Sequence, residues 1–146
     1  MTDFKTQLLK IYQDTNQFGK LNGMILKNDS EGDIEYEMTI TQQHLATPTT
    51  AHGGVVAAYV DGIMGVAALT VSAKNMCLVS TVEFKINYLK PAFLGDVLIG
   101  KGAVISAGKS IIIAKGEVYN QNNELISIAT GTFKAYPYQK SGMKLK

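Results

Sequence analysis

The chain has 146 residues; its fourteen basic side chains are all lysine, and against twelve acidic ones they leave a net charge of only +2. That balance does not favour a nucleic-acid binder, and the 46% hydrophobic content argues against disorder, so we expect one globular domain over residues 1–136. The single cysteine, Cys77, excludes an internal disulfide and a cysteine metal site, and we expect it to be buried. With only two histidines besides, the sequence predicts no metal site, and we expect no cofactor.

The N-terminal part predicts a short helix followed by a strand hairpin. Phe4, Leu8 and Ile11 share one face at helical spacing, which indicates an amphipathic helix. A first strand is predicted within residues 17–28 and a second within 34–41, joined by a polar turn. The first residues lack the long apolar core of a signal peptide, so we expect a cytoplasmic protein.

A long apolar helix is predicted to begin near Gly53 and to end between Ser72 and Lys74. It is about long enough to span a bilayer, but Asp61 lies near its middle, where a carboxylate costs roughly 2.5–3.5 kcal/mol on insertion. We therefore expect no membrane span but a helix buried inside the protein. Because it is apolar all round, it needs cover on nearly every side.

Four strands are predicted after the helix. Residues 78–92 alternate strictly between apolar and polar side chains, with Thr81 on the polar face. The apolar side chains are expected to share the other face: Val82, Phe84, Ile86 and Tyr88. Three further strands are separated by breaks at 95–96, 107–108 and 120–123, and such short turns predict an antiparallel meander. Residues 137–146 are predicted to be a flexible tail.

This order of elements predicts an α+β fold in which a curved antiparallel sheet wraps a long central helix, with a short N-terminal helix beside it. Such a sheet covers the one element that needs covering. Its open edges and half-apolar surface predict pairing into dimers.

Three stretches of the sequence resemble a known family. The stretch AHGGVVAAYVDGIMGVAAL, with TVEFKINYLKPAFLGD and ATGTFKAY after it, resembles the hotdog-fold acyl-CoA thioesterases of the phenylacetate-pathway type. The resemblance covers Leu45 to Tyr136. It implies the hotdog fold, hydrolysis of an acyl-CoA to a carboxylic acid and free CoA, no metal or organic cofactor, and a homodimer or a homotetramer built as a dimer of dimers.

The resemblance also implies roles for individual residues. By position, Asp61 matches the catalytic acid, Gly53 the backbone amide that binds the thioester oxygen, His52 the histidine beside it, and Thr81 the hydroxyl that positions the attacking water. One position departs from the pattern, since Ala46 stands where the family usually has Asn or Gln. Nearby polar residues are candidates to replace that side chain: Gln42, Gln43, His44 and Thr47.

The residues support this chemistry independently of the resemblance. A helix start offers unpaired amides and a partial positive charge to a developing oxyanion, and Gly53 and Gly54 let a ligand approach the backbone. Asp61 can deprotonate water or attack the carbonyl directly. Asp61 lies about 10–12 Å along the helix from the two glycines at 1.5 Å per residue, so we expect two antiparallel helices of a dimer to share each site.

Structural interpretations stand beside the functional ones. Asp61 is alternatively a buried polar contact across a dimer interface, and Thr81 a plain strand residue. His52 is expected to orient groups rather than to carry protons. Three residues are candidates for the phosphates of coenzyme A, although exposed lysines are common at strand ends: Lys90, Lys109 and Ser110.

Two other functions are compatible with the resemblance. The departure at Ala46 leaves open an acyl-CoA binder or sensor without turnover. A hydratase or dehydratase shares the fold and relies on a histidine and an acid, a pattern that residues 44–48 match only faintly.

Overall fold

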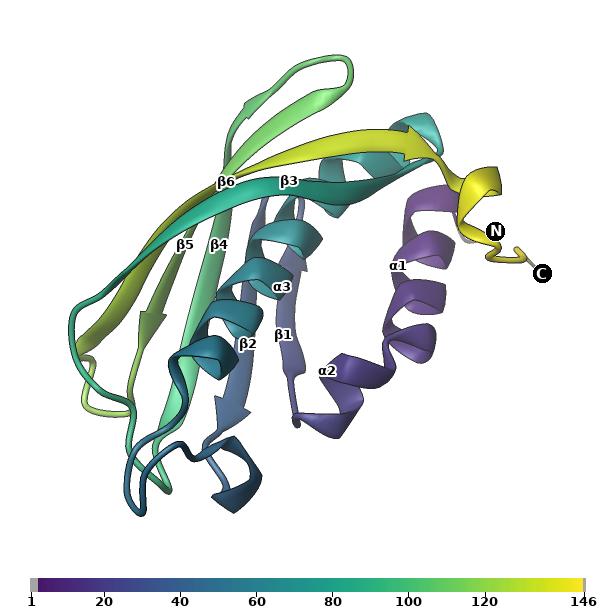
Figure 1. Ribbon diagram of the computed structural model, residues 1–146. Coiled ribbons are helices and arrows are strands. Elements are labelled where there is room, and N and C mark those ends of the chain that lie inside the picture. Colours follow the sequence, from purple (N-terminus) through teal and green to yellow (C-terminus); the bar gives the residue numbers. More distant parts are fainter. Residues whose placement is uncertain (1–2, 146) are drawn as a thin grey trace.

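The computed structural model describes residues 3–145, and six strands in it form one antiparallel sheet. The strands are β1 (Ile25–Ser30), β2 (Asp33–Thr39), β3 (Cys77–Tyr88), β4 (Val97–Ala107), β5 (Ile111–Tyr119) and β6 (Leu125–Pro137). Their order in the sheet is β1-β2-β4-β5-β6-β3. The sheet curves around a long helix, α3 (Gly53–Ser72), as the hotdog architecture requires (Figure 1). The predicted α+β fold is confirmed.

The N-terminal region departs from prediction at its second element. After α1 (Phe4–Thr15), a second short helix, α2 (Gln17–Leu21), occupies the start of the predicted first strand. The Asn16 side chain accepts the Gly19 N–H at 3.0 Å, which caps this helix. The strand therefore begins only at Ile25, and the prediction of strand over 17–28 is wrong in its first two thirds, residues 17–24.

Helix α3 lies at the centre of the core and contributes eleven buried residues. It continues into the 3-10 turn η2 (Ala73–Asn75). Residues Gly53–Asn75 are long and apolar enough to cross a membrane, with a mean hydropathy of 1.8, yet 56% of that apolar window is buried inside the protein. Five residues on one side of α3 stay partly exposed: Ala57, Ala58, Asp61, Gly62 and Gly65. A single protomer therefore does not cover the helix on every side.

A β-bulge in β3 overturns the predicted strict alternation. The register against β6 shifts between Thr81 and Glu83, and Val82 is 59% exposed. Thr81 reaches Asp61 of α3, while Phe84 also packs against the core. The extra residue at the bulge places Thr81 and Phe84 on the same face, because a one-residue insertion reverses the alternation beyond it.

The C-terminal residues lie beside α1 (Figure 1). The 3-10 turn η3 (Tyr138–Ser141) follows β6, and the rings of Phe4 and Tyr138 meet edge to face with centroids 5.2 Å apart. Met143 and Leu145 also pack against the core. The flexibility predicted for this tail stays a prediction, as does the domain boundary at residue 136.

Close packing of β4 on α3 predicts a stability effect at Gly102. A Cβ there would lie 2.9 Å from the backbone oxygen of Ile63 and 2.7 Å from its Cγ2. We expect Gly102→Ala to lower the free energy of unfolding by about 1–3 kcal/mol, as overpacked cores do. Chemical denaturation measures it, and exposed Lys115→Ala on the neighbouring strand should change stability by less than about 0.5 kcal/mol. Equal effects of both variants would contradict this packing.

Candidate active site

Asp61 and Thr81 form a hydrogen-bonded pair halfway along α3. The Thr81 hydroxyl donates to Asp61 Oδ1 at 2.8 Å. Among residues 3–145, no group donates to Asp61 Oδ2, and the side chain is partly exposed. The bulge in β3 makes this pair, because without it Thr81 would point away from α3. A carboxylate held at one oxygen and open at the other is suited to binding a water molecule.

The start of α3 presents one unused backbone donor. His52 is the N-cap, and its Nδ1 accepts the Gly54 N–H at 2.8 Å. The Gly53 N–H donates to no acceptor within residues 3–145. Gly53 is therefore the free donor at this helix end. The sequence predicts that Gly54 lets a ligand approach the backbone, but its N–H is already bound to His52 and becomes available only if that imidazole is displaced.

Tyr88 fixes the position of Gly53. Its hydroxyl donates to the Gly53 carbonyl oxygen at 2.8 Å, and its ring lies 3.4 Å from where a Cβ on Gly53 would stand. The sequence pattern predicts Tyr88 on the apolar face of its strand and indicates no role for it in the site. Only the packing of β3 against the helix start reveals its positioning contact.

One protomer does not bring Gly53 and Asp61 to the same point. They are eight residues apart on one helix, which corresponds to about 12 Å along its axis at 1.5 Å per residue. A reacting carbonyl needs its oxyanion donor and its nucleophile within about 3 Å. The structure thus places a candidate oxyanion donor and a candidate base at two separate points on one helix.

Asp61 and Thr81 line a cavity of about 240 Å³ between α1, α3, β3 and β6. Its remaining walls are mostly apolar or aromatic, and include Leu69, Leu78, Val79, Phe133 and Tyr136. Tyr12 of α1 also lines it; burial raises the pKa of Tyr12, and the negative charge of Asp61 raises it further. The Tyr12 phenol therefore stays protonated at neutral pH. No sequence pattern indicated this residue.

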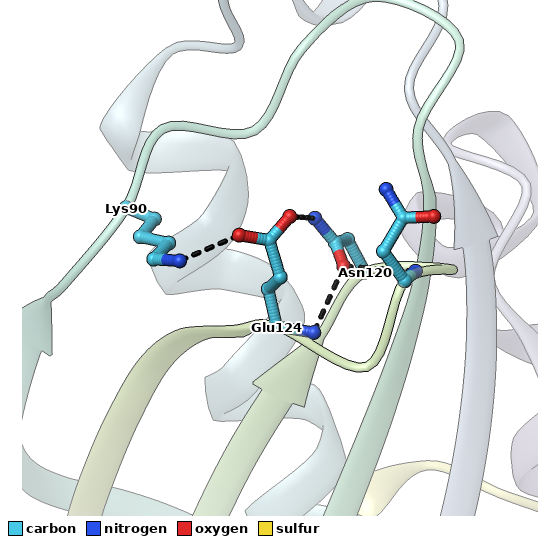
Figure 2. Close-up of polar contacts among 4 residues, drawn as sticks. Lys90, Asn120 and Glu124 are labelled. Carbon is cyan, nitrogen blue, oxygen red and sulfur yellow. Dashed lines mark hydrogen bonds and ion pairs between the residues drawn. The ribbon is translucent and has the colours of Figure 1, made fainter.

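Lys90, one candidate for the phosphates of coenzyme A, is held by an ion pair in the structure. Its ammonium group lies 2.5 Å from one carboxylate oxygen of Glu124, and the other oxygen accepts a hydrogen bond from Asn120 Nδ2 at 3.1 Å. Figure 2 shows both contacts. The pKa of the Glu124 carboxyl lies below its ordinary value, mainly because of the Lys90 ammonium and to a lesser extent because of the Asn120 amide. Lys90 lies two residues after Tyr88, at the Gly53 end of the sheet, and would have to exchange Glu124 for a phosphate.

Lys109 and Ser110 lie at the opposite end of the sheet. The Ser110 carbonyl oxygen accepts the Ala135 N–H at 2.7 Å, whereas Tyr88 pairs with Ser127. Those two points on β6 are eight residues apart, or about 26 Å at 3.3 Å per residue. One protomer therefore does not gather all three candidates around one phosphate group.

Polar side chains of the loop before α3 make hydrogen bonds within the loop and to helix α2. Gln43 Nε2 donates to the Leu21 carbonyl oxygen at 2.8 Å, and the Thr47 hydroxyl pairs with that of Thr50. His44 is buried, with its Nδ1 accepting the Thr41 N–H at 3.0 Å. These bonds engage three of the four candidates to replace the amide at Ala46, while the fourth, Gln42, is exposed on the same loop.

Metal-ligating side chains are not clustered in the described part of the chain. Within residues 3–145, no group of three or more His, Cys, Asp or Glu side chains could hold a metal ion. Cys77 is half-buried, not buried as expected, because it opens β3 at the edge of the sheet.

Comparison with known proteins identifies the family. The model of the thioesterase superfamily matches residues 49–127. Human acyl-coenzyme A thioesterase 13 is 28% identical over 122 residues (83% of this chain and 86% of that one), and the acyl-coenzyme A thioesterase PaaI of Escherichia coli is 26% identical over 112 residues, or 77% of each chain.

Solved structures share the fold. The E. coli PaaI protein from the phenylacetic acid degradation operon superposes with a TM-score of 0.81 at 20% identity, covering 92% of this chain and 96% of that one. A Streptococcus mutans protein solved with acetyl CoA gives 0.72 at 24% identity, covering 78% and 89%. The matched residues contain the Gly53 helix start, Asp61 and Thr81. The chain belongs to the thioesterase superfamily.

Proposed function

We propose that this protein is an acyl-CoA thioesterase, which hydrolyses a CoA thioester to a carboxylic acid and free CoA. The observation that carries the proposal is that one helix presents two suitable groups. Asp61 is a carboxylate with one oxygen free, and Gly53, at the helix start, has an N–H without an acceptor. Relatives that bear the name acyl-coenzyme A thioesterase support it, as does the neighbour solved with acetyl CoA. The expected cytoplasmic location remains part of the proposal.

The proposed reaction needs three groups. Asp61 takes a proton from a water molecule, and the water oxygen bonds to the thioester carbon while Thr81 holds the carboxylate in place. The carbonyl oxygen becomes an oxyanion, which the Gly53 N–H stabilises. When the C–S bond breaks, the thiolate of CoA leaves and receives the proton that Asp61 holds.

Direct attack by Asp61 is the alternative route. The carboxylate would displace the thiolate to form a mixed anhydride, and water would then release the acid. Single turnover in ¹⁸O-water distinguishes the routes, because only the anhydride route leads label into the Asp61 carboxylate when water attacks its aspartyl carbonyl.

A dimer is proposed to complete the site. Strand β3 lies at an edge of the sheet with twelve residues and one neighbour, and the small partly exposed residues of α3 lie on the uncovered side of that helix. A second copy packed antiparallel on this face would bring the Gly53 amide of one protomer to Asp61 of the other. A tetramer would be two such dimers.

Thiol release from a panel of short, long and aromatic acyl-CoAs tests the proposed function. We expect turnover of at least one of them without added metal. Absence of hydrolysis across the whole panel would overturn the proposal.

An acyl-CoA binder without turnover is the second candidate, and Ala46 favours it. Ala46 offers no polar side chain, and three of the four nearby side chains that could replace it make hydrogen bonds elsewhere: Gln43, His44 and Thr47. Titration calorimetry with the same panel distinguishes the two functions, because the binder would hold an acyl-CoA tightly and release no thiol.

Shared sites predict complementation between inactive subunits. Asp61→Asn removes the carboxylate and Gly53→Pro removes the amide, so a mixed dimer would hold one site with both groups intact and one with neither. After unfolding and refolding of an equal mixture, we expect about a quarter of wild-type thiol release, since half of the dimers are mixed. The separately refolded variants are the controls, and a mixture no more active than they are would show that the site lies within one protomer.

A further inference from the structure

The cavity beside Asp61 is partly walled by the end of the chain. Ser141 and Met143 line it together with Tyr12 of α1. We call residues 138–145 the C-terminal segment. Its own bonds fold it, since the Ser141 hydroxyl donates to the Tyr138 carbonyl oxygen at 2.6 Å and accepts the Met143 N–H at 3.1 Å.

Two contacts fasten the C-terminal segment to the body of the protein. The Tyr138 N–H donates to the Met76 carbonyl oxygen at 3.1 Å, and the Tyr138 ring meets Phe4 of α1. The N-terminal helix and the C-terminal segment are therefore in contact with each other, and both line this cavity.

The α3 wall of the cavity contains two glycines, which have no side chain to fill the space. Gly62 and Gly65 of α3 line the cavity, and a Cβ on Gly62 would have no atom within 4 Å. On Gly65 it would make only an ordinary contact with Phe133 at 3.5 Å. Glycine is a poor helix former, so two of them in one helix turn at this wall are costly to the helix and leave room for something else.

The cavity suits a small uncharged group. At about 240 Å³ it is smaller than the roughly 300–1,000 Å³ of sites for drug-sized ligands. It has room for roughly eight groups the size of a water molecule, each taking about 30 Å³. Among the described residues that line the cavity, Asp61 is the only carboxylate and none is a lysine. An acyl group ending in a second carboxylate would therefore be repelled by Asp61.

We propose that this cavity holds the acyl group of the substrate and that the C-terminal segment, through Met143, limits the length of that group. The proposal rests on the proposed function. The substrate class is an uncharged acyl group of short to medium length or with one aromatic ring. Met143 is suited to this role because its unbranched thioether adapts to a ligand that fills the space.

Two opposite substitutions test the proposal. We expect Met143→Ala to raise the ratio of kcat/KM for dodecanoyl-CoA over butanoyl-CoA by about tenfold or more, and Met143→Trp to lower it, because a few methylenes in an apolar pocket are worth at least that much. Succinyl-CoA should be a poor substrate for all three proteins. Lys144→Ala is the matched control, since its exposed side chain lies in the same segment and lines no part of this cavity.

Binding measurements distinguish a failure of this proposal from a failure of the proposed thioesterase function. The dissociation constants of the same proteins for butanoyl-CoA and dodecanoyl-CoA, measured by calorimetry, should shift in the same directions. If none of the proteins releases thiol, the proposed function fails, and the binding ratios alone decide the role of Met143. Ratios that stay at the wild-type value in both Met143 variants would overturn the inference even in an active enzyme.

Discussion

Asp61→Asn is expected to slow thiol release from the preferred acyl-CoA by a hundredfold or more, the scale on which lost general-base catalysis is measured. The amide oxygen of asparagine can still accept the Thr81 hydroxyl, which the carboxylate accepts at 2.8 Å, so the side chain should keep its place. What it loses is the negative oxygen that takes the proton from water. Substrate binding should persist, so the loss should fall on kcat and leave KM within a few-fold.

The control for this variant is Asp29→Asn, an identical chemical change on exposed strand β1. It should leave both kcat and the melting temperature at their wild-type values. Asp61→Asn activity within tenfold of the wild type would place the base elsewhere and leave Asp61 as an interface contact. A parallel fall in melting temperature would show that the carboxylate also stabilises the fold.

Gly53→Pro is expected to lower kcat by about 10²–10³-fold, as the loss of one oxyanion donor does. Proline is well tolerated at the first position of a helix, which is where Gly53 stands, and it removes only the N–H there. The preceding residue must be extended before a proline, and His52 already has φ −63° and ψ 135°. The substitution thus deletes one donor while the backbone keeps its course.

Gly53→Ala supplies the matched control. It adds the same Cβ against the Tyr88 ring, at 3.4 Å, but keeps the N–H. Thiol release should therefore fall far less in Gly53→Ala than in Gly53→Pro. Equal losses in the two variants would assign the effect to crowding at Tyr88 and would remove the amide from the proposed mechanism.

The sequence predicted the parts of the fold that local pattern determines. The apolar run from Gly53 could only be a covered helix, and the turn at Gly95-Asp96 was found because such residues favour breaks. In the structure Asp96 holds that turn by accepting the Phe93 N–H at 2.8 Å. Helix α2 was missed because its start depends on the Asn16 side chain, and a single cap is a weak signal beside a strand-like composition.

The residues of the candidate site were named from the sequence, but the way they are arranged was not predicted. Asp61, Gly53 and Thr81 were named from the sequence, yet strict alternation would have turned Thr81 away from the helix. A bulge has no reliable pattern in one sequence, since it is set by how two strands pair. The contributions of Tyr12 and Met143 depend on the two chain ends meeting over one cavity, which no local pattern encodes.

The eight-residue spacing of Gly53 and Asp61 on one helix bears on mixtures of normal and altered subunits as well as on chemistry. If each site draws one group from each protomer, a subunit that lacks only Asp61 still lends its amide to a normal partner. A subunit that lacks both groups inactivates both sites of any dimer that contains it. Expressed in equal amount with normal subunits, a subunit with both changes would therefore leave about a quarter of the sites active, whereas either change alone would leave about half.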